Sequence, residues 1–225
     1  MSIESIFGPR SIEPAFNNSA QKLEAILGID VSHYEPVPDY KRLKAHGVEF
    51  VYIKASEGTH LQDPLFEAHY MGAKDAGLLI GAYHFFHPAQ NISIQFQNFT
   101  DVIKDKAFDL PLVVDWETND DQDVEESAAD VFRFMHYLEL KFKRKPMLYA
   151  GESFLHDAQL PIEFAAYPLW LAHYGPKTAV KTPKPWGAWD VWQFSETFYV
   201  SGLRSNAVDA NWTTLSLEEL KRLGF

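Results

Sequence analysis

Two acidic residues stand two positions apart at the end of an apolar run, in the sequence LPLVVDWE (110–117). Residues i and i+2 of a strand face the same side, so a strand here would aim Asp115 and Glu117 together. Two like charges in one place push one pKa up, and such a pair can supply a general acid beside a carboxylate that stays ionised. The spacing therefore predicts acid–base chemistry at this strand end.

Two more acids occupy matching places, Asp30 in the first apolar run and Asp209 in the last. If the strands close into a barrel, the first and last are neighbours, and these side chains approach each other at the mouth that holds Asp115 and Glu117. One acid in such a run could equally cap a loop or pair with Arg or Lys. Four of them, in runs with few basic residues, favour a single functional cluster.

Histidines and aromatic residues gather at the same strand ends. His84 and His87 could be imagined as metal ligands, but the His-x-His pair of metal-dependent barrel hydrolases is missing from the first strand. Hydrogen bonding or substrate contact is the favoured role, and no metal or cofactor is expected. Paired acids ringed by aromatic faces suit glycoside cleavage. The residues predicted to bind substrate are Tyr83, His84, Tyr149, Trp170 and Tyr174.

The elements that must position these residues are eight short apolar runs, the first five of which alternate with helix-like segments. The runs cover residues 28–34, 50–56, 78–86, 110–117, 146–151, 168–174, 189–195 and 206–212. Three prolines exclude a helix between residues 174 and 189. The pattern predicts an α/β fold with a mostly parallel sheet, in which five β–α units precede three strands joined by loops. Eight strands can close into a barrel, whose function collects at the C-terminal strand ends.

Helix boundaries carry their own signals. Asp63, followed by proline, is expected to cap one helix, and Asn91 another. Segment 122–143 has an apolar stripe at spacings of three and four, an acidic start and a basic end. Ser216 and Glu219 have the spacing of a capping box for a last helix.

Composition removes several classes of function. The chain has 225 residues, no cysteine and a formal net charge of −11 at pH 7, which excludes disulfides and thiolate sites and argues against a nucleic-acid partner. No phosphate-binding glycine loop and no GxSxG motif occurs. Neither a membrane span nor a signal peptide is visible. We expect residues 1–27 to form an N-terminal extension and residues 28–225 a single catalytic barrel.

Seven motifs resemble, in order, those of one known family. They are GIDVSHYE (28–35), VYIKASEG (51–58), GAYHFFHP (81–88), LPLVVDWE (110–117), WLAHY (170–174), WQFS (192–195) and VDANW (208–212). Together they resemble the family 25 glycoside hydrolases, the Chalaropsis-type lysozymes or N-acetylmuramidases. The resemblance runs from about residue 28 to the C-terminus, and it implies a single irregular (β/α)5(β)3 TIM-like barrel.

The resemblance also implies a reaction, the cleavage of the β-1,4 bond between N-acetylmuramic acid and N-acetylglucosamine in peptidoglycan. Net retention is the expected outcome, although the spacing of Asp115 and Glu117 does not by itself decide between retention and inversion. Glu117 would be the general acid, and Asp115 would be a direct nucleophile or the stabiliser of an intermediate formed by the substrate's 2-acetamido group. Asp30 and Asp209 would complete the acidic floor. Among the aromatic residues, Tyr83 and Tyr149 would line the sugar subsite nearest the chemistry. No metal is needed.

The expected partner is therefore the glycan strand of bacterial peptidoglycan, bound by a monomer that takes no nucleic acid and does not enter a membrane. We expect synthesis in the cytoplasm without a signal peptide, then action on the cell wall after release by phage lysis or specialised secretion.

Three alternative functions fit the sequence less well. A non-catalytic sugar-binding barrel would keep the aromatic residues and lose an acid, whereas all four acids are present. A chitinase-like DxxDxDxE motif would require aspartate at positions 110 and 113, where Leu110 and Val113 stand. A metal-dependent deacetylase is disfavoured by the spacing of the ligands.

Overall fold

The computed structural model describes residues 25–203 and 207–225. Its strands are β1 (Ile26–Val31), β2 (Val48–Glu57), β3 (Leu61–Gln62), β4 (Leu79–Phe85), β5 (Val113–Asp115), β6 (Met147–Gly151), β7 (Leu169–Ala172), β8 (Val191–Phe198) and β9 (Val208–Thr213). Its α-helices are α1 (Tyr40–Ala45), α2 (Phe66–Asp75), α3 (Ile92–Ile103), α4 (Val124–Phe142), α5 (Glu152–Ala158) and α6 (Leu217–Arg222). Most of the predicted N-terminal extension, residues 1–24, lies outside the described residues.

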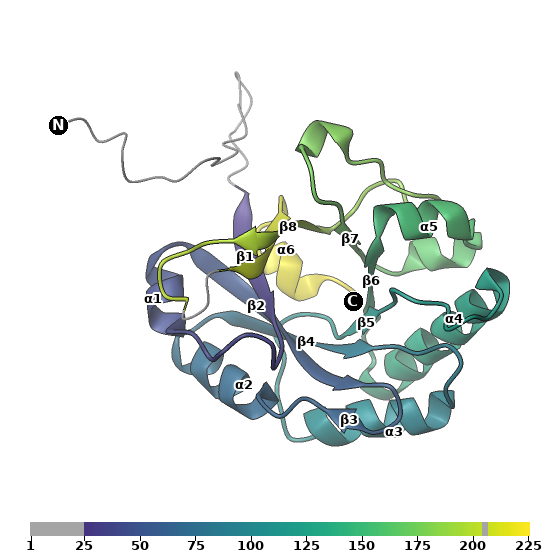
Figure 1. The fold of residues 1–225 in the computed structure, drawn as a ribbon, viewed down its shortest axis with the longest axis horizontal. Helices are drawn as coiled ribbons and strands as arrows, with labels where there is room; N and C mark the ends of the chain where they lie inside the picture. Colours follow the sequence, from purple (N-terminus) through teal and green to yellow (C-terminus); the bar gives the residue numbers. More distant parts are fainter. Residues whose placement is uncertain (1–24, 204–206) are drawn as a thin grey trace.

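The strands form a closed barrel. The order is β1-β9-β8-β7-β6-β5-β4-β2, and β1 also pairs with β2, which closes the ring. Neighbouring strands are parallel, except that β9 runs antiparallel to both β8 and β1. The short β3, which the sequence did not predict, extends the edge of β2. Figure 1 shows α1 to α5 arranged outside the strands. The predicted eight-strand barrel of five β–α units and three further strands is confirmed.

Alternation along each strand separates an inner from an outer core. On β5, Val113 packs with Phe50 and Trp170 in the cluster inside the barrel, whereas Val114 belongs to the cluster between strands and helices. Asp115 is the next inward position. The alternation that buries the valines therefore aims this acid into the barrel mouth.

Side-chain capping bonds start three of the six α-helices, α1, α3 and α6. Asn91 accepts the N–H of Ile94 at the start of α3, and Ser216 and Glu219 form both bonds of the capping box on α6. The prediction for α2 was wrong, since this helix begins at Phe66 with Leu65 as its N-cap. The carboxylate of Asp63 instead accepts the N–H groups of Leu65 and His33, which ties the turn before α2 to the end of β1.

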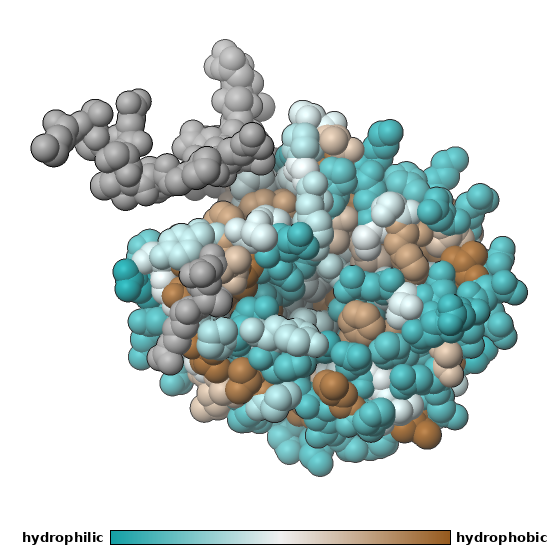
Figure 2. Space-filling model, viewed as in Figure 1, coloured by the Kyte–Doolittle hydropathy of each residue, from teal (hydrophilic) through white to brown (hydrophobic). Residues whose placement is uncertain are grey.

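The end of the barrel opposite the site is closed by α6. Leu220 of this helix belongs to the same core cluster as Phe50, Leu110 and Met147, and Arg144 donates to the carbonyls of Lys221 and Leu223. Hydrophilic residues dominate the face in Figure 2, where hydrophobic ones form small separate patches. Across the described residues, no helix is both long and apolar enough to cross a membrane.

Candidate active site

A cavity of about 70 Å³ opens at the C-terminal ends of the parallel strands. Its lining residues are Asp30, Tyr83, Asp115, Glu117, Tyr149, Trp170, Gln193 and Asp209. The structure thus brings together all four acids predicted from the sequence and three of the predicted aromatic residues. Gln193 is the lining residue that the sequence did not single out.

The end of β5 presents its two acids and turns Trp116 away. Trp116 is buried on the outer side, where its ring lies edge-on to Phe154 at 5.0 Å between centroids and its indole N–H donates to the carbonyl of Thr118. Main-chain bonds from Phe86 to the carbonyl of Asp115, at 2.8 Å, and from Trp116 to the carbonyl of Tyr149, at 3.0 Å, fix this strand end between its neighbours. Asp115 and Glu117 consequently share the barrel mouth.

Burial dominates the electrostatics of this pair. Asp115 is only 5% exposed, and its pKa is raised well above the usual range by desolvation and then by the negative charge of Glu117. The pKa of Glu117 is raised by desolvation, against a hydrogen bond with Asp115 and the positive charge of Lys54. Two carboxyls so close hold one proton between them more easily than none. No donor within residues 25–203 and 207–225 reaches the buried Oδ1 of Asp115.

Asp30 and Asp209 form a second pair of carboxyls. They stand directly opposite each other in the antiparallel register of β1 and β9, as barrel closure predicts. Oδ2 of Asp30 accepts N–H bonds from the side chains of Asn211, at 2.7 Å, and Gln193, at 3.0 Å. Desolvation raises the pKa of Asp30 to about 6 despite these two bonds. Desolvation and the charge of Asp30 raise the pKa of Asp209 to about 8.

Two amide side chains organise the floor of the cavity. Oε1 of Gln193 accepts the hydroxyls of Tyr149, at 2.8 Å, and Tyr174, at 2.7 Å. Oδ1 of Asn211 accepts the indole N–H of Trp170 at 2.8 Å. Neither amide was predicted from the sequence. Asn211 lies two residues after Asp209 on β9, so the alternation that paired Asp115 with Glu117 could have placed it on the same face.

The remaining predicted substrate-binding residues take different positions. Tyr174 is half exposed at the rim and reaches the cavity through its bond to Gln193. His84 is not brought to the cavity. Its buried ring lies within hydrogen-bond distance of Ser56 and Gln95 and packs against Phe99 and Phe134 on the helix side of the sheet. Tyr83 faces inward, so its sequence neighbour on the strand must face outward.

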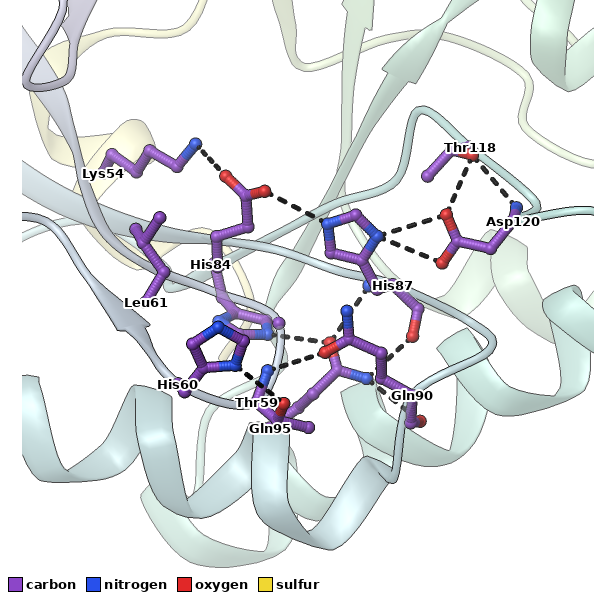
Figure 3. Close-up of polar contacts among 12 residues, drawn as sticks. Lys54, Thr59, His60, Leu61, His84, His87, Gln90, Gln95, Thr118 and Asp120 are labelled. Atoms are coloured by element: carbon purple, nitrogen blue, oxygen red, sulfur yellow. Dashed lines mark hydrogen bonds and ion pairs between the residues drawn. The ribbon is translucent and has the colours of Figure 1, made fainter.

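A chain of polar contacts lies beside the cavity, at the ends of β2, β4 and β5 (Figure 3). Lys54 donates to Glu57 at 2.7 Å, and the other oxygen of Glu57 lies 3.2 Å from Nε2 of His87. Nδ1 of His87 lies 3.1 Å from both carboxylate oxygens of Asp120. Lys54 was not predicted as a site residue from the sequence, although a lysine inside an apolar strand is itself an unusual signal.

Other mouth histidines are also engaged by acids. His33 is 2.8 Å from Asp63 and His173 is 2.6 Å from Glu152. In the part of the chain that the structure describes, no group of three or more His, Asp or Glu side chains is arranged to hold a metal ion.

A closed α/β barrel with two pairs of carboxyls and an aromatic lining at one mouth has the architecture of a barrel glycosidase. Comparison with known proteins agrees. The model for glycosyl hydrolases family 25 matches residues 29–203. Lysozyme M1 of Streptomyces globisporus is 32% identical over 214 residues, which cover 90% of this chain and 70% of that protein.

Solved structures give the same answer. The bacterial lysozyme from Streptomyces coelicolor superposes with a TM-score of 0.80 and 30% identity, covering 88% of this chain and 96% of that one. The muramidase from Trichobolus zukalii gives a TM-score of 0.77 and 30% identity over 88% and 98% of the two chains. The chain belongs to the glycosyl hydrolases of family 25, and it is a glycosidase of the lysozyme, or muramidase, class.

Proposed function

We propose that this protein hydrolyses the β-1,4 bond between N-acetylmuramic acid and N-acetylglucosamine in bacterial peptidoglycan, with net retention at the anomeric carbon. The observation that carries the proposal is the convergence of Asp115 and Glu117 on one aromatic-lined cavity. The names lysozyme and muramidase, borne by relatives of similar fold, support the choice of substrate.

Glu117 is the general acid. It is the more exposed member of its pair, so it can reach the glycosidic oxygen of a chain lying across the mouth. Desolvation raises its pKa, which favours the protonated form that donates to the leaving oxygen. The same group, once ionised, takes a proton from the water that completes the hydrolysis.

Asp115 acts at the anomeric side of the bond. It lines the cavity, and no donor in the described residues reaches its buried Oδ1. It can attack the anomeric carbon directly, or it can accept the N–H of the 2-acetamido group while that group's oxygen attacks. Both routes retain configuration. An inverting pair needs about 6.5–9.5 Å between its carboxyls to admit a water, and the placement of Asp115 and Glu117 two residues apart at one strand end favours the shorter separation of a retaining pair.

The second pair and the aromatic lining complete the sugar site. Asp30 and Asp209 supply acceptors for sugar hydroxyls on the opposite wall, and Tyr83, Tyr149 and Trp170 line the sugar's apolar faces. We also propose that the barrel, which begins with β1 at Ile26, acts as one monomeric catalytic domain after an N-terminal extension. Its partner is the glycan strand, which it meets in the cell wall after release from the cytoplasm.

The decisive experiment is the change Glu117→Gln. The amide cannot donate a proton, so we expect digestion of purified peptidoglycan to fall by about 10²–10⁴-fold while the circular dichroism spectrum is unchanged. Mass spectrometry of the parent digest should find muramic acid at the new reducing ends, and NMR should show the β-anomer first. Near-parental activity of Glu117→Gln, or glucosamine at those ends, would sink the proposal. Initial release of the α-anomer would overturn retention alone.

A further inference from the structure

Lys54 is a buried cation at the barrel mouth. It follows Phe50 and Tyr52 at alternate positions of β2, and both of these side chains belong to the inner core cluster. Lys54 therefore faces the barrel interior one layer nearer the mouth, where it is only 6% exposed. A buried ammonium is costly unless its charge is balanced, so its presence here calls for a partner.

The contacts of Lys54 lead toward the acids on β5. Its Nζ lies 5.1 Å from the centroid of the Phe85 ring, and Phe85 is the register partner of Asp115. Lys54 itself is the register partner of Tyr83, which lines the cavity. Its positive charge lowers the pKa of both Asp115 and Glu117, against the rise caused by burial.

A chain of polar contacts holds Lys54 from its other side (Figure 3). The carboxylate of Glu57 is placed between the ammonium and the ring of His87, and Asp120 takes the second ring nitrogen. Each nitrogen of the His87 ring thus lies within hydrogen-bond distance of a carboxylate. The chain joins segments that follow β2, β4 and β5.

The other titratable groups that face Asp115 and Glu117 are acids or tyrosines. They come from β1, β4, β6 and β9 and are Asp30, Tyr83, Tyr149 and Asp209. Within the described part of the chain, Lys54 is the cation that acts on both members of the pair.

We propose that Lys54 is a positioning residue for the acid–base pair, held in place by Glu57, His87 and Asp120. While the pair shares one proton, its single negative charge is matched by the ammonium. When Glu117 passes its proton to the leaving oxygen it becomes ionised, and Lys54 stabilises this new carboxylate in a site of low dielectric. This inference rests on the proposed function, because it assumes that Glu117 is the acid.

The variant Lys54→Met tests this role through the pH profile of peptidoglycan digestion. Loss of the cation raises the pKa of both carboxyls, so both limbs of the profile should move to higher pH by about one unit. We expect kcat to fall at least tenfold with little change in KM, and Lys54→Arg to restore the position of the profile. Lys221→Met, on α6 at the opposite end of the barrel, is the matched control and should leave the profile in place. A folded Lys54→Met variant with the parent profile overturns the proposal.

The change Asp120→Asn tests the supporting chain at a less buried position. It should lower kcat several-fold at constant KM in the parent, and it should have no further effect in Lys54→Met if it acts through that residue. Independent, additive losses in kcat would contradict the proposal that Asp120 acts through Lys54. If Lys54→Met does not fold, Asp120→Asn decides alone, and an unchanged kcat overturns the proposal. Activity retained in Glu117→Gln would instead overturn the proposed function, so the two failures are distinguishable.

Discussion

The barrel mouth holds two pairs of carboxyls that differ in how they are supported. Asp115 and Glu117 lie at the end of β5, two residues apart, and are acted on by the buried ammonium of Lys54. Asp30 and Asp209 face each other across β1 and β9, and two amide N–H groups converge on one oxygen of Asp30. Desolvation is the largest cause of a raised pKa in all four carboxyls.

The difference in support indicates a difference in role. A cation stabilises added negative charge, which suits a pair that must release a proton during the reaction. Amide donors fix one oxygen of Asp30 in place without supplying a charge, which suits a wall that binds and orients. The same contrast holds for single atoms. Oδ1 of Asp115 has no donor among the described residues, whereas Oδ2 of Asp30 accepts two N–H bonds.

The largest expected contrast comes from replacing one aspartate of each pair by asparagine. Asp115→Asn removes the free carboxylate oxygen at the anomeric side, so kcat should fall at least about a hundredfold. It should also remove one of the two titrating limbs of the pH–rate profile. Asp30→Asn keeps an oxygen that Asn211 and Gln193 can still reach, so its loss should be smaller and both limbs should persist. Steady-state kinetics between pH 4 and 9 check this. A larger loss in Asp30→Asn would reverse the assignment of the two pairs.

Much of this arrangement could be predicted from the sequence, because it follows from strand periodicity. Two positions along a strand return to the same face, which paired Asp115 with Glu117. Closure of eight strands makes the first and last neighbours, which brought Asp30 to Asp209. The same rule of alternation excludes His84 from the cavity once Tyr83 is known to face inward. Whether a residue at a strand end reaches the site therefore depends on which face of the strand it occupies as well as on its position along the strand.

The supporting groups could not be predicted in this way. Gln193 contacts Asp30 from 163 positions away in sequence, and Asn211 contacts it from 181 positions away. Which strands converge in three dimensions is set by barrel closure, but which polar side chains meet there depends on rotamers and on the bulge between Lys54 and Ser56 in the pairing of β2 with β4. The start of α2 was predicted wrongly for a similar reason, since the carboxylate of Asp63 accepts the N–H of His33, which lies 30 residues earlier.

A second prediction concerns stability in the amide-supported pair. The pKa of Asp209 is raised from its ordinary value of 3.8 to about 8, so the stability contributed by this group is fully present below about pH 4 and is lost as pH rises through about 8. Asp209→Asn should therefore unfold like the parent at pH 4 but be more stable at pH 9, on the order of 1 kcal/mol or about 2–4 °C in Tm.

Calorimetry at the two pH values measures this difference. The exposed Asp101 on α3 offers a matched control, since Asp101→Asn should change Tm equally at both pH values. If Asp209→Asn gained no stability at high pH, the carboxyl of Asp209 would already be ionised at little cost. Charge repulsion between Asp30 and Asp209 would then not destabilise the fold.

The smallest expected contrast lies within the amide support itself, where two tyrosine hydroxyls donate to the same Oε1 of Gln193. Tyr149 lines the cavity and its ring meets Trp170 edge-on at 4.7 Å, whereas Tyr174 is 52% exposed at the rim. Each change to phenylalanine removes one of two donors, and the buried one should cost more because water can replace the other. We expect Tyr149→Phe to lower kcat/KM about tenfold and Tyr174→Phe no more than two- to threefold. Equal losses would mean that the two hydroxyls contribute equally to holding Gln193, and that water can replace the hydroxyl of Tyr149 as easily as that of Tyr174.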